Sequence, residues 1–411
     1  MSRSGGPRRA ARYYRQLPAP VRLLSAGVLV NNVGGFVTMF LTLILATRGI
    51  SAAEIAVALI VSSAFAVAGA WLGGALLSRM PARRVIIGSM AGSALFTAAL
   101  IPAGPYPVTV AVVCLIAVCN RAYVPAATTL VGSSSPPDQR MQMFSFFQLF
   151  NNIGAAVAPA IAGFLLTRSL TVLLVIDAAT SAAFALVAAR LPGDAVPAGP
   201  RPAGGCRTRD TTGRRRRYLL FCAGAALVAV AYAQRSGALP LAFHDRRDSL
   251  ELLGYLFTGS TIAVVIFQFP VSFLASRIDI RLTLALGAAL IGGGYCLLLA
   301  GFSVPALVAS TALWTAGELV YAPAAPTVAT MMSSSRTHGA YQGTLYSART
   351  AGQALGPAFG VLAYSAGASA AWWGCGALGV VAACLFLITV RPRDAGGPDG
   401  DRAPATAAAG G

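Results

Sequence analysis

The 411-residue sequence contains no lysine: all 31 of its basic residues are arginine. A P-loop ATPase needs the lysine of its Gly-x-x-x-x-Gly-Lys motif, and Schiff-base chemistry needs a reactive lysine amine. The absence of lysine therefore excludes both kinds of chemistry. If the protein performs work, we expect an ion gradient rather than ATP hydrolysis at a P-loop to drive it.

Charged residues are also scarce. They make up 11% of the chain, against 56% hydrophobic residues, whereas a soluble protein usually carries about 25% charged residues. The apolar residues occur in runs of about 20 separated by short basic loops, which is typical of a polytopic helical membrane protein. Lipid cannot satisfy an exposed backbone and the runs are too long for barrel strands, so we predict an all-α integral membrane protein.

Several patterns of enzyme and metal chemistry are missing as well. The seven cysteines form no Cys-x-x-Cys pair, and His244 and His338 fall in predicted loops outside any metal-binding pattern. Neither the His-Glu-x-x-His motif of metalloproteases nor the Gly-x-Ser-x-Gly motif of serine hydrolases occurs. We expect no enzymatic activity, no metal and no cofactor.

The apolar runs predict twelve transmembrane helices. They lie at residues 21–46, 52–77, 85–104, 108–132, 139–166, 170–190, 218–242, 252–275, 282–302, 305–332, 339–365 and 369–390. This predicts a cytoplasmic basic tail (1–20), a six-helix bundle (21–190), a flexible basic linker (191–217), a second six-helix bundle (218–390) and a disordered cytoplasmic tail (391–411).

The arginines are distributed unevenly between the two sets of loops. The tails, the linker and the loops after spans 2, 4, 8 and 10 hold 24 arginines together, whereas the opposite loops hold four. Basic loops remain in the cytoplasm. We therefore predict a multi-pass protein of the cell inner (plasma) membrane with both termini cytoplasmic. The net charge of +18 reflects this orientation, and no basic loop has the features of a nucleic-acid-binding site.

The two halves match each other at one offset. Residues 123–127 (YVPAA) match residues 321–325 (YAPAA), 198 positions later, and the same offset relates Ser78-Arg79 to Ser276-Arg277, Gly154 to Gly352 and Pro159 to Pro357. Because each half has six helices, the halves enter the membrane from the same side and form parallel repeats. Such repeats predict a cavity between the halves near the midplane, opened to each side in turn by a rocking motion.

Over residues 20–390 the chain resembles the major facilitator superfamily. Residues 74–84 (GALLSRMPARR) are similar to its Gly-x-x-x-Asp-Arg-x-Gly-Arg-Arg motif after span 2, with Gly74, Arg79 and Arg83 at matching positions and Ser78 in place of the aspartate. The resemblance implies the major facilitator fold and a secondary active transporter. The carboxylate of the usual charge lock between the halves is absent.

Span 11 resembles the Gly-Pro motif of drug:proton antiporters. It contains Gly343, Gly352, Gly356, Pro357 and Gly360, and span 5 carries a softened version with Gly154 and Pro159. Small residues four apart let helix backbones approach closely. We expect both spans to pack across the interface that opens and closes, with plain helix packing as the alternative. The resemblance implies an efflux protein of the 12-span antiporter-like branch.

Five ionisable residues lie inside predicted spans: Arg121, Asp177, Arg235, Glu318 and Arg349. A charge at the bilayer centre costs at least about 2.5–3.5 kcal/mol, so these residues should pair with one another or face a cavity. Glu318 is the carboxylate predicted nearest mid-span, and removal from water favours a protonated carboxylic acid. We therefore expect Glu318 to carry the coupled proton; the alternative is a fixed salt bridge to Arg349.

The other intramembrane charges allow two interpretations each. Arg121 is a charge partner or an anionic-substrate contact, or else it hydrogen-bonds the backbone near Pro125. Asp177 is a second proton site, or it caps or pins a neighbouring helix. Arg235 neutralises Asp177 or the loop residues Asp245 and Asp248, or it contacts the substrate.

Uncharged polar residues inside the spans are candidates for the substrate cavity, where polar groups orient a ligand between apolar walls. They are Asn31, Asn32, Gln148, Asn151, Asn152, Tyr232, Gln234, Gln268 and Tyr346. Amide side chains also join helices within lipid, which is the alternative for each of them.

These features predict a secondary active transporter that works by rocker-switch alternating access. The resemblance implies proton-coupled export of small organic molecules. A proton-coupled importer of a sugar or another nutrient is the alternative, followed by a non-transporting scaffold or receptor. The expected partners are a small-molecule substrate, protons and membrane lipid, with no nucleic acid, and we expect a monomer.

Overall fold

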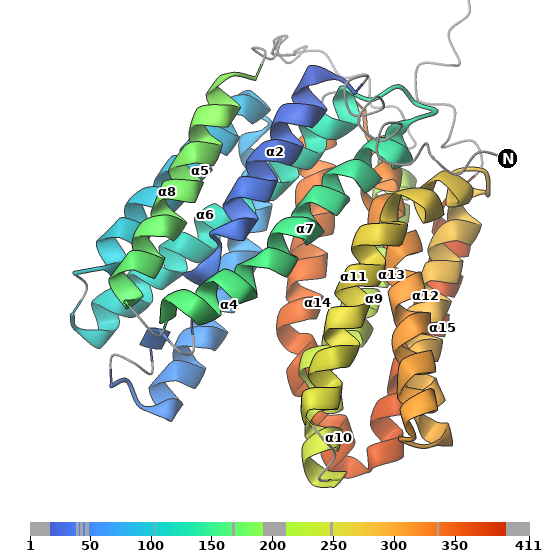
Figure 1. The fold of residues 1–411 in the computed structure, drawn as a ribbon. Coiled ribbons are helices and arrows are strands. Elements are labelled where there is room, and N and C mark those ends of the chain that lie inside the picture. Colours follow the sequence, from blue (N-terminus) through green and yellow to red (C-terminus); the bar gives the residue numbers. More distant parts are fainter. Residues whose placement is uncertain are drawn as a thin grey trace, which may run out of the picture.

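The computed structural model is helical throughout the part of the chain that it describes. It describes residues 17–37, 41, 44–45, 49–102, 104–166, 169–191, 211–246, 250–334 and 337–391. The predicted tails, apart from residues 17–20 and 391, and linker residues 192–210 lie outside the described residues. The helices form two bundles, one from each half of the chain (Figure 1).

The first bundle contains the predicted spans 1 to 6. Its helices are α2 (Ala19–Val33), α4 (Ala52–Leu76), α5 (Ala82–Leu100), α6 (Tyr106–Ser133), α7 (Arg140–Leu166) and α8 (Leu170–Ala189). Span 1 is broken at Gly34–Gly35, and the helix resumes at Phe36.

The second bundle contains spans 7 to 12. Span 7 consists of α9 (Thr211–Tyr232), a 3-10 turn η1 (Ala233–Ser236) and α10 (Ala238–Arg246). The other helices are α11 (Leu250–Ala275), α12 (Ile280–Cys296) with the turn η2 (Leu297–Ala300), α13 (Val304–Met332), α14 (His338–Ala366) and α15 (Ala368–Thr389).

The helix starts repeat the offset found in the sequence. Helix α4 begins at residue 52 and α11 at residue 250, and the same spacing of 198 relates α5 to α12, α6 to α13, α7 to α14 and α8 to α15. The first span of each bundle is also interrupted at a similar place, at Gly34–Gly35 and at η1. The two halves are therefore structural repeats as well as sequence repeats.

One boundary of the predicted linker is wrong. Residues 211–217, which the sequence analysis places in the linker, form the first turns of α9, including Arg214 to Arg217. Arginine is a good helix former, so the run continues the helix beyond the apolar residues. The Arg217 Nε donates a hydrogen bond of 3.2 Å to the carbonyl of Thr389 at the end of α15.

Seven of the described helical stretches are long and apolar enough to span a membrane by length and composition alone. They are Val57–Leu76, Tyr106–Ser133, Leu170–Ala189, Gly213–Phe243, Leu252–Ala275, Ile280–Ala300 and Ser369–Thr389. Helices α2, α7 and α14 are not among them, and these three supply polar residues to the cavity described below.

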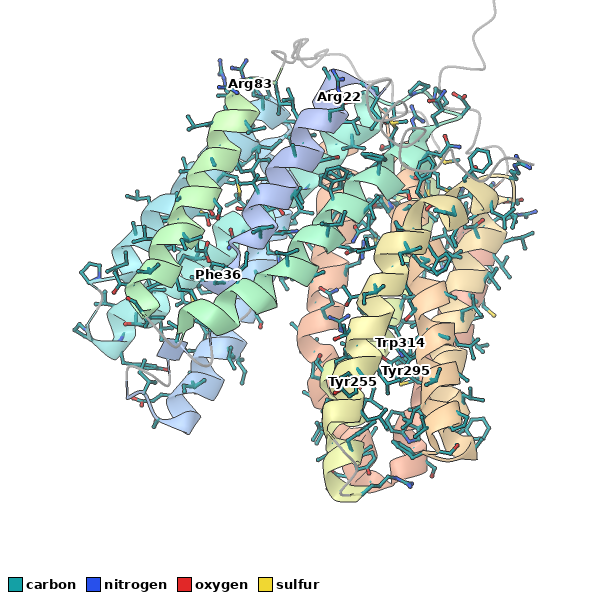
Figure 2. All side chains as sticks on the ribbon, viewed as in Figure 1. Arg22, Phe36, Arg83, Tyr255, Tyr295 and Trp314 are labelled. Atoms are coloured by element: carbon teal, nitrogen blue, oxygen red, sulfur yellow. The ribbon has the colours of Figure 1, made fainter. Side chains whose placement is uncertain are left out.

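Each bundle has its own apolar core. In the second bundle Tyr295 stacks between Trp314 and Trp372, with ring centroids 6.4 Å apart in both pairs. All three rings are buried, and Figure 2 shows Tyr295 next to Trp314. Each half is therefore stabilised by a core of its own.

The halves touch near one end of the molecule. We call it the terminal face, because α2 begins and α15 ends there. A Cβ built on Gly74 of α4 would lie 2.6 Å from the Cα of Gly343 in α14. The Ser145 hydroxyl of α7 donates to the Gln268 carbonyl of α11 at 3.1 Å. Figure 1 shows the bundles close together at this face and diverging towards the opposite face.

Most glycines of the Gly-Pro pattern pack inside their own half. A Cβ on Gly154 would lie 2.6 Å from the Asn32 Cβ in α2. On Gly352 it would lie 2.5 Å from the Ala226 carbonyl oxygen in α9, and on Gly356 2.5 Å from the Ala233 Cβ in η1. These glycines therefore pack within their own half, with Gly343 as the exception, whereas the spans themselves do pack across the interface between the halves, α7 against α11 and α13, and α14 against α4 and α6. The glycines bring α7 and α14 close to the interrupted first span of each half.

Candidate functional site

A cavity of about 670 Å³ lies between the two halves. Helices α2, α4, α6 and α7 line it from the first half, and η1 and α14 line it from the second. Its residues on α6 and α14, such as Arg121 and Arg349, lie near the middle of those helices. The cavity thus occupies the place expected for a substrate site between parallel repeats.

The structure brings most of the predicted site residues into this lining. The lining includes Asn31, Asn32, Gln148, Asn151 and Tyr346, together with the three intramembrane arginines Arg121, Arg235 and Arg349. Asn32 donates to the Asn151 side-chain oxygen at 2.8 Å and joins α2 to α7. Asn31 accepts a hydrogen bond of 3.1 Å from Ser181 of α8.

Four predicted cavity residues do not line the cavity. Gln234 is 2% exposed and donates to the carbonyls of Val230 and Gly356, so it joins the first span of the second half to α14. Gln268 is 0% exposed and donates to the Leu319 carbonyl.

The other two predicted residues that do not line the cavity are Asn152 and Tyr232. Asn152 accepts from Gln148, one turn earlier on the same helix, at 3.1 Å. Tyr232 lies behind Arg235. Sequence spacing finds polar residues in a span but does not give the direction in which each points, so these four were assigned to the wrong surroundings.

Sequence reasoning missed six polar lining residues. They are Ser62, Ser63, Asn120, Tyr123, Thr350 and Gln353. Asn120 precedes Arg121, and Gln353 follows Arg349 by one helical turn, so proximity to the intramembrane charges was the available signal. The repeat offers a second signal, because residues 120 and 151 occupy the positions of Glu318 and Arg349 in the other half.

Glu318 is connected to the cavity through a tyrosine. The Tyr232 hydroxyl donates to Glu318 Oε2 at 2.7 Å, and Arg235 Nη1 donates to the same hydroxyl at 2.7 Å. The Arg235 guanidinium also lies over the Tyr232 ring, 5.1 Å from its centroid. Because Arg235 lines the cavity, a hydrogen-bonded chain of three side chains leads from the cavity to Glu318.

Arg349 and Arg121 have different surroundings from Arg235. Arg349 lies over the rings of Tyr321 and Tyr346, at 5.7 and 5.4 Å from their centroids. It forms no ion pair with Glu318 among the described residues, although the two charges are close enough to attract. The predicted fixed salt bridge is therefore absent. Arg121 lies near enough to Arg349 for their like charges to repel.

Two further expectations about the arginines are wrong. In the described part of the chain Arg121 makes no hydrogen bond to the backbone near Pro125 or to any other group; it faces the cavity instead. Arg235 contacts Tyr232 and is attracted by Glu318, and among the described residues it forms no ion pair with Asp177. The neighbouring loop residue Asp248 lies outside the described residues.

Asp177 of α8 binds the backbone at the break in span 1. Its Oδ2 accepts a hydrogen bond of 2.8 Å from the backbone N–H of Val37, where the helix resumes after Gly34–Gly35. The side chain is 3% exposed. An acidic residue at a helix start satisfies orphan N–H groups, so this geometry matches the capping interpretation of Asp177.

The motif after span 2 lies at the terminal face, where Figure 2 also shows Arg22. Gly74 contacts α14, and Arg83 donates to the Ala189 carbonyl at the end of α8. Arg79 is exposed, and its side chain has no partner among the described residues. Arg83 therefore fastens α5 to α8 within the first half.

Two prolines and two histidines of the sequence analysis remain. Pro357 packs against the interruption of span 7, since a Cβ on Gly237 would lie 2.7 Å from its Cα. Pro159 lies within α7, and its side chain is outside the described residues, as is that of His244. His338 is the first residue of α14, at the terminal face, where burial and the nearby Arg140 charge lower its pKa.

Comparison with known proteins places the chain in a family. The model of the Major Facilitator Superfamily matches residues 23–233 and 221–409. An uncharacterized MFS-type transporter of Bacillus subtilis (strain 168), YttB, is 23% identical over 351 residues, covering 84% of this chain and 88% of YttB.

Solved structures of similar fold agree with this match. The human organic anion transporter MFSD10 (TETRAN) has a TM-score of 0.69 at 18% identity, covering 90% of this chain and 99% of its own. The transporter FucP in its outward conformation has a TM-score of 0.73 at 17% identity, covering 91% and 99%. The protein is a multi-pass membrane protein of twelve helices and not an enzyme, and it belongs to the major facilitator superfamily of secondary transporters.

Proposed function

We propose that this transporter couples the movement of a small organic molecule to the movement of protons, with Glu318 as the proton carrier. The observation that carries the proposal is the chain from Arg235 through Tyr232 to Glu318. It links a half-buried carboxylate to the substrate cavity without tying it into a fixed ion pair. Such a group can gain and lose a proton as its surroundings change.

Alternating access is supported by the contacts between the halves. These contacts, Gly74 with Gly343 and Ser145 with Gln268, lie next to the terminal face, and the bundles diverge towards the opposite face (Figure 1). The arginine distribution favours a cytoplasmic terminal face. With that orientation the molecule is in an outward-facing state, and rocking the halves would open the cavity to the cytoplasm.

The proposed coupling uses the charge of Glu318. When ionised, Glu318 accepts the Tyr232 hydroxyl and attracts Arg235 and Arg349. Protonation removes this negative charge, so both arginines become more available to the cavity. Because charges interact strongly in a low-dielectric site, the protonation state of Glu318 changes what the cavity binds.

For the direction of transport we put export first, as the Gly-Pro pattern of spans 5 and 11 favours. Uptake is the alternative, and the release of the arginines on protonation of Glu318 favours it for an anionic substrate, because proton and anion then bind together. The two directions predict opposite effects of pH on substrate affinity. In an exporter driven by proton exchange, protons and substrate compete, so affinity falls as pH falls. In a proton-coupled importer they bind together, so affinity rises as pH falls.

The proposal is tested with Glu318→Gln, which keeps the shape of the side chain but cannot ionise. Inverted membrane vesicles with a proton-gradient dye are challenged with lipophilic cations, antibiotics, organic acids and sugars. The wild type should move protons with one of these classes, and the variant should lose that coupled movement. The matched control is Glu54→Gln, at the exposed N-terminal cap of α4. Undiminished proton-driven transport by Glu318→Gln would overturn the proposal.

A further inference from the structure

We propose that the cavity binds an organic anion between Arg121 and Arg349, with Arg235 as a third positive group. The inference rests on the proposed transport function and names the substrate class of the same site. The described lining of the cavity is positively charged, because it contains three arginines and no carboxylate. The nearest acid, Glu318, lies behind Tyr232.

Arg121 and Arg349 lack acceptors for their N–H groups. A guanidinium carries five N–H donors, yet neither side chain donates a hydrogen bond to any group in the described part of the chain. Arg349 lies instead over the faces of the Tyr321 and Tyr346 rings. Two half-buried arginines that repel each other are unfavourable unless an anion lies between them.

The other polar side chains around the cavity are mostly paired, which sets these two arginines apart. Arg235 donates to Tyr232, Asp177 accepts from Val37, and Asn32 donates to Asn151. Unused donors are therefore concentrated where the ligand would lie. Carboxylates and phosphates accept two parallel hydrogen bonds from one guanidinium, so either group suits this place.

The other lining residues indicate which groups the ligand carries besides its anionic group. Gln148 and Gln353 offer amides to hydroxyl or carbonyl groups, while Leu59, Val113 and Ile116 form an apolar wall. A compact organic acid with both polar and apolar surface fits this combination. A lipophilic cation would meet three positive charges, so the cavity discriminates against it.

The experiment uses the full chain in lipid nanodiscs and probes that differ in charge: benzoate with benzamide, glucuronate with glucose, and benzyltrimethylammonium as the cation. Thermal unfolding is followed by tryptophan fluorescence, because a ligand that binds the folded state raises Tm. We expect at least one anion to raise Tm while its neutral counterpart and the cation do not. Arg121→Gln and Arg349→Gln should each weaken anion binding by tenfold or more.

Three further variants control for structural damage. Arg121→Lys and Arg349→Lys keep the charge and should retain a weaker anion response, since the bidentate fork is lost. Arg84→Gln, an exposed arginine of α5 outside the cavity, should bind like the wild type.

The proposal is overturned if no anion raises Tm above its neutral counterpart, or if the response survives in both glutamine variants. The Glu318→Gln variant distinguishes a failure of the anion-binding proposal from a failure of the proposed proton coupling. A variant that loses proton-driven transport but still binds the anion supports both ideas. Loss of anion selectivity with proton coupling intact would overturn the substrate class alone, and anion binding without any proton coupling in the wild type would overturn the proposed function alone.

Discussion

At the residue scale, Tyr232 joins the cavity between the halves to the half-buried acid Glu318. Its hydroxyl donates to Glu318 and accepts from Arg235, and its ring packs edge-on against Trp314 with centroids 5.9 Å apart. The neutral hydroxyl lies between a carboxyl group and a guanidinium. A change in the charge or position of either group therefore alters the hydrogen bond to the other. The tyrosine is therefore a positioning residue for the proposed proton carrier.

Replacing Tyr232 with phenylalanine removes both hydrogen bonds and keeps the ring contact. A hydrogen bond to a charged group contributes about 1.5–3 kcal/mol, and ionised Glu318 loses its donor. The pH at which transport is half-maximal should therefore rise by about one unit or more, with little loss of folded protein. The measurement is the pH profile of transport beside the thermal stability of the purified protein. An unchanged profile would show that Tyr232 is only a packing residue.

Sequence reasoning found the charged residues of the site but only some of its polar ones. Glu318, Arg121 and Arg349 are conspicuous because charge is rare within spans. Gln234 and Gln268 carry the same amide group as residues of the cavity lining, yet they donate hydrogen bonds to helix carbonyls. The residue type alone does not distinguish a lining residue from one that joins helices. Asn120 could have been found from the repeat, since it occupies the position of Glu318 in the other half.

At the element scale, the contact between α4 and α14 closes the terminal face. Gly74 and Gly343 let the two backbones meet, and a Cβ on Gly339 would lie 2.3 Å from the Leu77 Cβ. The helices can approach this closely only because side chains are absent on both sides. The closed terminal face therefore depends on these glycines.

Gly74→Ala should destabilise the closed terminal face. Its new Cβ would meet the Gly343 Cα at 2.6 Å, and overpacking of this kind costs about 1–3 kcal/mol. A cysteine at Ser145, which is 0% exposed in the contact with α11, should then react with a water-soluble maleimide roughly tenfold faster or more. Gly88→Ala on α5, where a Cβ meets nothing within 4 Å, is the control. Equal labelling rates in the two variants would contradict the role of Gly74.

Helix positions were predictable because hydrophobic runs and the repeat both report them. The interruptions were not: Asn31 and Asn32 precede Gly34–Gly35, and Gln234 and Arg235 lie in η1, but polar residues inside a predicted span do not by themselves indicate a break. The partners of the Gly-Pro glycines were also mistaken, because a small-residue pattern indicates close packing without naming the helix that packs. Those partners are a tertiary property of each bundle.

At the scale of the whole molecule, the fold follows from two repeats, each with its own core. The family match and the equal helix spacing confirm the twelve-helix architecture that the sequence predicted. The conformational state was not predictable, because under the proposed rocking mechanism the sequence and the spans are the same in every state. The structure shows which ends of the two halves meet, at the terminal face.

The most direct test of the central claim measures both faces of the molecule in one preparation. Spin labels at residues 84 and 277 report the separation of the halves at the terminal face, and labels at residues 51 and 255 report it at the opposite face; all four positions are exposed. Acidification or addition of the transported solute should lengthen distances in one pair and shorten them in the other. Distances that change in the same direction at both faces, or at neither, would contradict alternating access by rocking of the two halves.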